Sequence, residues 1–141
     1  ELVEIANRTP SSSSPQAQPA ANGQNIRSMQ TLARGVPIAP HVTTYAAQLL
    51  KASHPDDPAS PQAVRDFVRY GASPRGMQAM ILAGKIIALM DGRYNVAYED
   101  IRSAALPALR HRLILNFEAQ AEGYSTDKVI AAILEKILPQ D

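Results

Sequence analysis

The chain has 141 residues, a formal net charge of +1 and no cysteine. Near-neutral charge gives no field that would attract nucleic acid or an anionic membrane surface, and the missing thiols exclude disulfides and thiolate metal sites. Aromatic residues are few, whereas alanine, leucine and isoleucine are common, which favours helices over sheets. No stretch is typical of a signal peptide or a membrane span. We therefore expect a soluble, cytosolic, all-α domain, a small bundle of about five helices.

Residues 1–24 differ in composition from the rest of the chain. Residues 1–8 mix apolar and charged side chains, as at the end of a helix that belongs to a preceding domain. Residues 9–24 are rich in serine, proline and glutamine and have little to bury, so we expect a flexible linker. The chain begins without methionine, which favours a fragment of a longer protein. Residues 25–141 are expected to form the helical domain.

Three helices are predicted before the middle of the chain. The first has apolar residues at helical spacing over 26–35. The second has an i, i+3, i+4, i+7 apolar stripe and covers 42–53. The third begins after a capping residue, Ser60, with proline next to it, and is expected to continue to Tyr70.

The longest predicted helix lies between two glycines, Gly71 and Gly92. Ser73 is a suitable N-cap, and Pro74 suits the first turn, where a missing N–H costs no hydrogen bond. Gly92 suits the C-terminal stop. Because helix 74–91 is apolar nearly all round, we expect neighbours to bury it on several sides, as the central helix of the bundle.

Arg75 lies in the first turn of this central helix. The helix dipole disfavours a cation there. Two interpretations stay open on the residues alone: the side chain reaches into solvent, or it shares an anion, such as a phosphate, with the free N–H groups of the helix terminus.

Two further helices are predicted after residue 92. Glu99 and Asp100 favour the first turn of one helix, and Pro107 is expected to kink or split it. The last helix is capped by residues 125–127 and carries a sharp amphipathic stripe. Core packing explains this stripe, and a groove for a partner helix is the alternative.

A basic trio, Arg110, His111 and Arg112, stands between these two helices. It is either a solvated face with His111 packed at its edge or an interface. The apolar residues 113–115 that follow could be helical or briefly extended.

Four segments together resemble the C-terminal lid of MoxR-type AAA+ ATPases. They are Gly-Ala-Ser-Pro-Arg-Gly at 71–76, Gly-Arg-Tyr-Asn-Val at 92–96, Glu-Asp-Ile at 99–101 and Leu-Arg-His-Arg-Leu-Ile-Leu-Asn at 109–116. Their order and spacing match the family, and the resemblance covers residues 25–138. The chain departs from the family at positions 97 and 98, where alanine and tyrosine replace the usual threonine or serine and proline.

The resemblance implies a nucleotide role for Arg75. In the family, the arginine of this segment is the sensor 2 residue, which reaches the γ-phosphate of ATP. Ser73 and Gly76 would belong to the helix N-terminus at that site. Residues 1–8 would be the remnant of the ATPase core.

The resemblance also implies cofactors and partners for the full-length protein. ATP and Mg²⁺ would bind on a missing N-terminal core, in a cytoplasmic ring oligomer, most often a hexamer. The basic trio would contact the core or a neighbouring subunit. Relatives act as chaperone-like machines that assemble or activate other complexes, with von Willebrand A-domain partners. Neither nucleic acid nor membrane insertion is implied.

The chain lacks the residues for catalysis on its own. It has no G-x-x-x-x-G-K-[ST] phosphate loop, no Ser-His-Asp set and no recognisable pair of carboxylates. His54 stands beside two aspartates, but without a second ligand cluster we predict no metal site. We expect no ATP hydrolysis and no bound cofactor for the fragment alone. The alternative function is a free-standing helical protein-interaction module, and a phosphate-loop motif encoded upstream of Glu1 would decide against it.

Overall fold

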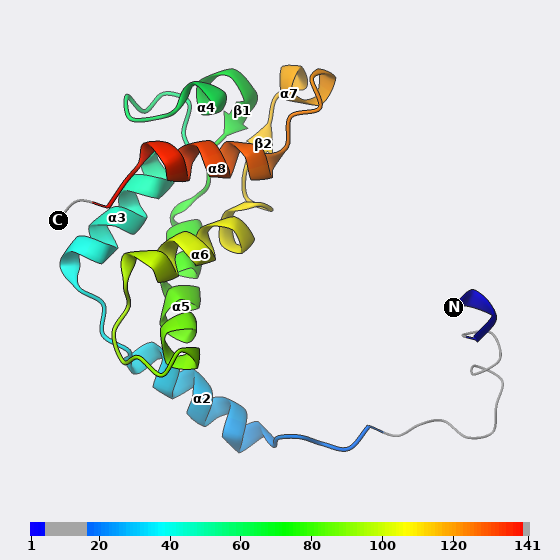
Figure 1. Cartoon of the computed structure of the whole chain (residues 1–141), viewed down its shortest axis with the longest axis vertical. Coiled ribbons are helices and arrows are strands. Elements are labelled where there is room, and N and C mark those ends of the chain that lie inside the picture. The colour runs from blue at the N-terminus through cyan, green and yellow to red at the C-terminus, as the bar shows by residue number, and fades with distance from the viewer. Residues whose placement is uncertain (5–16, 140–141) are drawn as a thin grey trace. The chain divides into compact units, whose positions relative to one another are not determined.

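The computed structural model describes residues 1–4 and 17–139 (Figure 1). The chain divides into two units, Glu1–Gln30 and Thr31–Asp141, and the second contains the helical domain. The elements in chain order are α2 (Gly23–Gly35), α3 (Pro40–Lys51), α4 (Gln62–Phe67), β1 (Val68–Tyr70), α5 (Pro74–Met90), α6 (Tyr98–Leu109), β2 (Ile114–Leu115), α7 (Phe117–Ala121) and α8 (Thr126–Lys136).

The all-α prediction is confirmed, since the described residues form helices with one small two-stranded sheet. Helix α2 begins at Gly23, and part of the expected linker 9–24 and of segment 1–8 lies outside the described residues. The limits of the predicted domains therefore stay predictions. No helix in the described part of the chain is both long and apolar enough to cross a bilayer.

Helix α5 packs most closely against α6, and the two lie side by side in Figure 1. Its buried residues recur every four positions, at Gly76, Met80, Gly84 and Ala88. A Cβ atom at Gly84 would lie 3.1 Å from Cδ1 of Ile101 on α6. The small residue therefore lets the two helices approach, and the core continues from this contact into α3 and α8.

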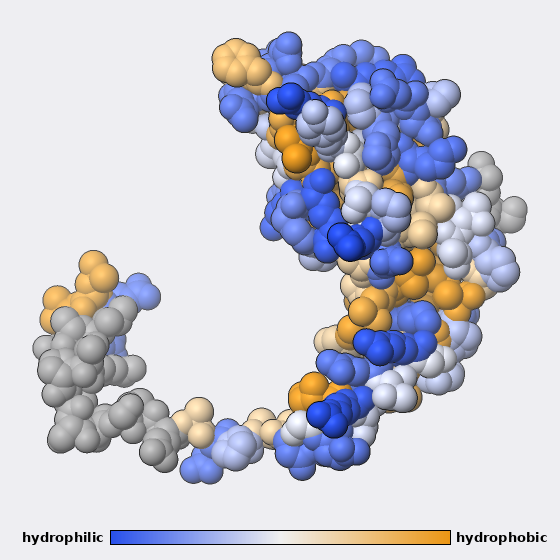
Figure 2. All heavy atoms as spheres, turned by 180° about the vertical axis from the view of Figure 1, so that it is seen from behind, coloured by the Kyte–Doolittle hydropathy of each residue, from blue (hydrophilic) through white to orange (hydrophobic). Residues whose placement is uncertain are grey.

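Neighbours bury α5 on the sides of α3 and α6, but not all round as its composition suggested. Leu82, Ile86 and Met90 form a line on this helix with exposed fractions of 42%, 43% and 81%. Figure 2 shows hydrophobic residues exposed at the surface of the helical unit, in the region where Figure 1 draws α5. The apolar composition of the helix therefore does not measure its burial, because apolar side chains also make up much of a protein's surface.

Helix α4 corresponds to the predicted third helix, but it ends before Tyr70 and begins after a different N-cap residue. Helix α4 ends at Phe67, and Val68–Tyr70 form strand β1, antiparallel to β2. The backbone N–H of Asn116 also donates to the carbonyl of Phe67 at 2.9 Å. Pairing with a distant segment thus overrides the local helical pattern. The N-cap is Pro61, while the hydroxyl of Ser60 donates to the carbonyl of His54 instead.

Residues 113–121 contain a short strand, a possibility that the sequence left open, and a short helix that it did not predict. Ile114–Leu115 are extended, which settles the choice between helix and strand there. Helix α7 then follows, and the side chain of Asn116 caps it by accepting from the N–H of Ala119 at 3.0 Å. Its amide nitrogen donates to the carbonyl of Asp66, so one side chain links this turn to α4.

Helix α6 continues through Pro107 and ends at Leu109. The proline lies in the last turn, where only one helical hydrogen bond is lost. Of the two predicted effects of Pro107, a split is therefore wrong, and a kink stays a prediction. Ser125 caps α8 as expected, because its side chain accepts from the N–H of Lys128.

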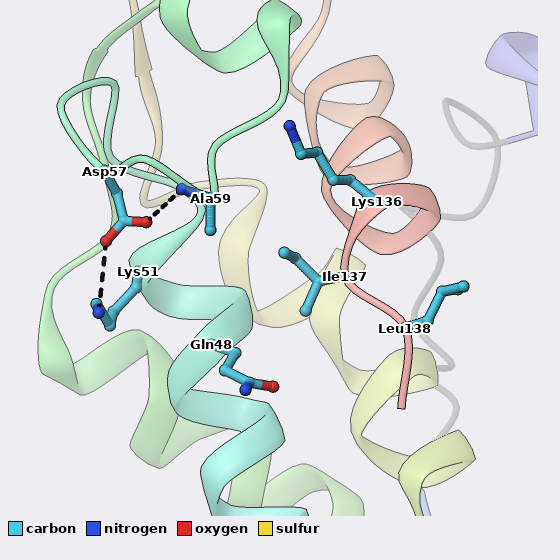
Figure 3. A pocket seen from close by; sticks show the side chains of 7 residues that line it. All are labelled: Gln48, Lys51, Asp57, Ala59, Lys136, Ile137 and Leu138. Carbon is cyan, nitrogen blue, oxygen red and sulfur yellow. Dashed lines mark hydrogen bonds and ion pairs between the residues drawn. The ribbon is translucent and has the colours of Figure 1, made fainter. Parts of the chain in front are cut away.

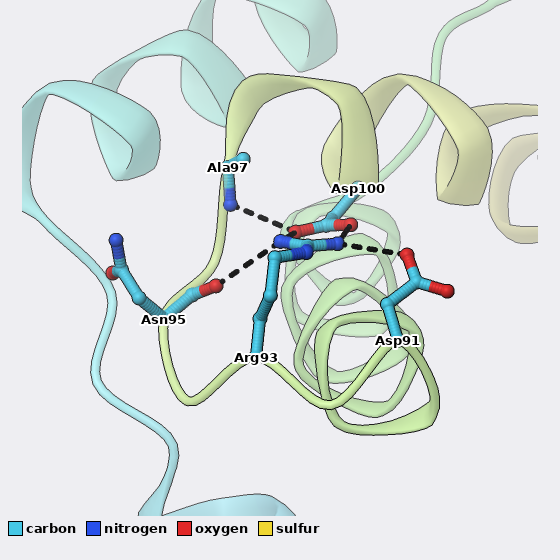
Figure 4. Close-up of polar contacts among 5 residues, drawn as sticks. All are labelled: Asp91, Arg93, Asn95, Ala97 and Asp100. Atoms are coloured by element: carbon cyan, nitrogen blue, oxygen red, sulfur yellow. Dashed lines mark hydrogen bonds and ion pairs between the residues drawn. The ribbon is translucent and has the colours of Figure 1, made fainter.

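Arg93 and Asp100 join the end of α5 to the start of α6 (Figure 4). The guanidinium donates to both carboxylate oxygens of Asp100, at 2.6 and 2.9 Å, and to Asp91 at 3.0 Å. Asp100 is only 2% exposed and also accepts from the N–H of Ala97 at 2.8 Å. The carboxylate therefore supplies the N3 half of a capping box, while alanine at the N-cap has no side-chain acceptor for the other half.

We expect Asp100 to make the fold sensitive to acid. Hydrogen bonds from Arg93, and then from the N–H of Ala97, hold the pKa of this carboxyl below its usual value. The unfolded chain takes up the proton first as the pH falls, so the stabilisation is complete at neutral pH. It is lost below about pH 5, until the pH passes the lowered pKa.

The variant Asp100→Asn should lower the free energy of unfolding by about 1–3 kcal/mol at neutral pH. It should also reduce the difference in stability between neutral and acid solution, measured by urea unfolding. Asp56→Asn, which changes an exposed aspartate, is the control and should keep the full difference. An Asp100→Asn chain with the parent's pH dependence would contradict this role.

Candidate nucleotide-sensing site

Arg75 is the second residue of α5 and is exposed. Ser73 is the N-cap by backbone conformation, and Pro74 occupies the first helical position, as predicted. The hydroxyl of Ser73 accepts no bond from the helix, although the carbonyl of Ser73 accepts from the N–H of Gly76 at 2.7 Å. Arg75 itself has no hydrogen bond or ion pair with a described residue.

The buried Gly76 brings the start of α5 against the end of α6. A Cβ atom here would lie 3.0 Å from Cδ2 of Leu109 and 3.4 Å from Cδ of Arg112. The aliphatic part of Arg112 therefore packs next to the residue that follows Arg75. This places one member of the basic trio beside the predicted site.

The basic trio is not a single free patch. Arg110 makes a two-pronged ion pair with Asp127 on α8, with N–O distances of 2.6 and 2.8 Å. Arg112 donates to the carbonyl of Ala108 and contacts the ring of His111. Arg110 thus faces α8, whereas Arg112 faces the start of α5.

Sequence reasoning missed two residues that hold the segment before Arg75. The hydroxyl of Ser53 accepts from the N–H of Ala72, and the ring of His54 bonds to the carbonyl of the same residue. Both residues follow the C-terminus of α3. No short-range pattern could have shown these contacts, because they join positions 18 and 19 residues apart.

The described residues also form a pocket of about 220 Å³ between the ends of α3 and α8 (Figure 3). Its wall includes Lys51, which pairs with Asp57 at 3.6 Å, and Lys136, which donates to the carbonyl of Ser60. The other lining residues are Gln48, Ala59, Ile137 and Leu138. None of the predicted site residues lines this pocket, so it does not belong to the Arg75 site.

The donor set at Arg75 fits a phosphate oxygen but not a metal ion. An exposed guanidinium without a partner among the described residues offers a planar pair of donors to an anion. The described chain has no group of three His, Cys, Asp or Glu side chains that could hold a metal.

A sequence model of the AAA lid domain matches residues 60–133, more than half of the chain. The chain therefore belongs to the AAA lid domain family.

Curated relatives and a solved structure agree with this assignment. The chain is 29% identical over 127 residues to the chaperone MoxR1 of Mycobacterium tuberculosis, covering 89% of this chain and 34% of that protein. It is 38% identical over 50 residues to the protein MoxR of Paracoccus denitrificans, covering 36% of this chain and 15% of that protein. The resemblance to MoxR-type proteins seen in the four segments is thus confirmed.

A crystal structure from Cytophaga hutchinsonii, of a protein assigned as an ATPase, superposes with a TM-score of 0.83 at 28% identity. The match covers 99% of this chain and 43% of that one. The chain thus spans at most about a third of the length of the MoxR proteins it matches and less than half of the solved chain.

Proposed function

We propose that this chain is the lid of a MoxR-type AAA+ ATPase and that Arg75 is its sensor 2 arginine. The observation that carries the proposal is the position of Arg75: it is exposed in the first turn of α5, without a partner among the described residues. A cation at this end of a helix opposes the helix dipole, and an anion bound there would reverse that disadvantage.

The chemical role of Arg75 follows from its charge and shape. When ATP is bound on the core, its γ-phosphate supplies the group to be transferred, and negative charge is spread over the phosphate oxygens. Arg75 would bind those oxygens through two N–H donors and stabilise that charge. Because the arginine lies on a separate domain, the same contact would make the position of the lid depend on the nucleotide.

The basic trio supports a contact with the rest of the machine. Arg112 packs beside Gly76 at the start of α5 and contacts His111, and these two residues would face the ATPase core or a neighbouring subunit of a ring. Arg110 pairs with Asp127 on α8. It would therefore hold the segment after α6 against α8 and would not contact the core or a neighbouring subunit. The ring, its cytoplasmic location and a chaperone-like action with von Willebrand A-domain partners are part of the same proposal and rest on family resemblance.

We expect Arg75→Ala to slow ATP hydrolysis by the full-length protein by about 10-fold or more. Arg75→Lys should recover only part of the rate, because an ammonium lacks the planar pair of donors. The matched control is Arg65→Ala. Arg65 is an exposed arginine of α4 that donates to the carbonyl of Pro58, in the loop before this helix. Equal rates for Arg75→Ala and the parent would contradict the proposal.

A further inference from the structure

We propose that Ser53 and His54 are positioning residues that set where Arg75 stands. They do so by holding the backbone of Ala72, and we call these three residues the Ala72 anchor. This inference rests on the proposed role of Arg75. It adds that the site depends on a loop at the end of α3, remote in sequence from the Gly-Ala-Ser-Pro-Arg segment.

The anchor binds both backbone polar groups of one buried residue, Ala72. The N–H of Ala72 donates to Oγ of Ser53 at 3.0 Å, and Nε2 of His54 donates to the carbonyl of Ala72 at 3.0 Å. The side chain of Ala72 is completely buried. Two hydrogen bonds and a buried side chain thus hold the chain three residues before Arg75.

The anchor is itself held by α3 and by the loop that follows. The hydroxyl of Ser53 donates to the carbonyl of Leu50 at 2.6 Å, and the N–H of His54 donates to the carbonyl of Lys51 at 3.0 Å. The carbonyl of His54 accepts from the hydroxyl of Ser60 at 2.6 Å. The groups that support the anchor therefore belong to α3 and to the loop after it.

The close approach of the two segments requires glycine at position 71. A Cβ atom there would lie 2.6 Å from the carbonyl oxygen of Ser53 and 2.7 Å from Cγ of His54. These distances are too short for a Cβ atom. Gly71, the first residue of the Gly-Ala-Ser-Pro-Arg segment, therefore leaves the room that the contacts of the anchor need.

The anchor matters for Arg75 because nothing else among the described residues holds that side chain. Only two residues separate Ala72 from Arg75, and one of them is Pro74, whose φ angle is fixed by its ring. The Ala72 anchor therefore holds the chain on the N-terminal side of Arg75, while the packing of Gly76 against Leu109 holds it on the other side. Misplacing a phosphate-binding donor by about 1 Å can slow a reaction by as much as about 100-fold.

The contact with Ala72 requires a hydrogen atom on Nε2 of His54, because a carbonyl oxygen only accepts. A glutamine at this position carries its amide nitrogen at a similar reach, which makes His54→Gln the conservative variant.

The test compares ATP hydrolysis by variants of the full-length protein. We expect His54→Ala to lower kcat/KM by about 3- to 10-fold, with a melting temperature within about 4 °C of the parent, because the ring is exposed and leaves no cavity. His54→Gln should recover most of the loss. His41→Ala removes another exposed histidine of the same unit and should have no effect.

The decisive comparison repeats His54→Ala in an Arg75→Ala background. An anchor that acts through Arg75 has nothing left to position there, so the two changes should not add, and the second should alter kcat/KM by less than about 1.5-fold. The same 3- to 10-fold loss in both backgrounds would show a purely structural role and overturn the inference. Normal ATP hydrolysis by His54→Ala together with impaired hydrolysis by Arg75→Ala would also overturn the inference. That result would leave the proposed function intact. An Arg75→Ala protein that hydrolyses ATP normally would instead overturn the proposed function, and the inference with it.

Discussion

Replacing Met80 by aspartate is expected to unfold the helical unit. Met80 lies in the middle of α5, is completely buried and belongs to the core that α5 shares with α3 and α6. A carboxylate there would have no partner, and burying an unpaired charge or protonating it costs about 4 kcal/mol or more. This is a large part of the total stability of a small domain. Loss of the cooperative thermal transition, followed by circular dichroism, is the measurement.

Leu82→Asp is the matched control on the same helix. Leu82 is 42% exposed, so an aspartate can reach water, and the free energy of unfolding should fall by less than about 1 kcal/mol. The same holds for Ile86, which the apolar composition of the helix would have selected as a core position. A Met80→Asp chain that melts cooperatively near the parent temperature would mean that α5 does not hold the core.

Gly71→Ala is expected to destabilise the unit by about 1–3 kcal/mol. The added methyl group would overlap the carbonyl oxygen of Ser53, a backbone atom that cannot turn away, as well as the ring of His54. The two segments must therefore move apart, and the hydrogen bonds to Ala72 lengthen. The measurement is the free energy of unfolding from urea denaturation.

The control for this change is Gly23→Ala, where no atom lies within 4 Å of the added methyl group. It should be neutral or slightly stabilising, because alanine is the better helix former in α2. If Gly71→Ala is as stable as the parent, the close approach at the Ala72 anchor is not needed for the fold.

The sequence predicts the helices that have strong local signals. Ser73 and Ser125 stand at the N-cap positions of α5 and α8 as predicted, although only the side chain of Ser125 accepts a bond from its helix. Gly92, with a φ angle of 71°, follows the end of α5 as predicted. These features depend on residues within one or two turns, so local chemistry is sufficient to define them.

The errors arise where distant contacts decide the structure. Val68–Tyr70 leave the helical pattern because they pair with residues more than 40 positions later. Ser60 has the sequence context of an N-cap, but its hydroxyl bonds to His54 across a loop. The open face of α5 was not predictable either, because an apolar helix gives no sign of which side lacks a neighbour.

The residues of the candidate site were likewise predictable only where local sequence signals exist. Arg75 could be selected from the sequence, because a cation in the first turn of a helix is unusual and the surrounding segment resembles a known family. Ser53 and His54 could not be selected, since hydroxyl and imidazole groups at the end of a helix have many ordinary roles. Their importance for Arg75 is visible only when the hydrogen bonds to Ala72 are known.

The most direct measurement of the central claim compares the affinities of ATP and ADP for the full-length protein and its Arg75→Ala variant. If Arg75 binds the γ-phosphate, the substitution should weaken ATP binding by about 10-fold, as expected for loss of a charge-assisted contact, and change ADP binding by less than about 2-fold. The ADP value is an internal control for the fold and for the rest of the nucleotide site. Equal losses for the two nucleotides, or no loss for ATP, would show that Arg75 does not sense the γ-phosphate.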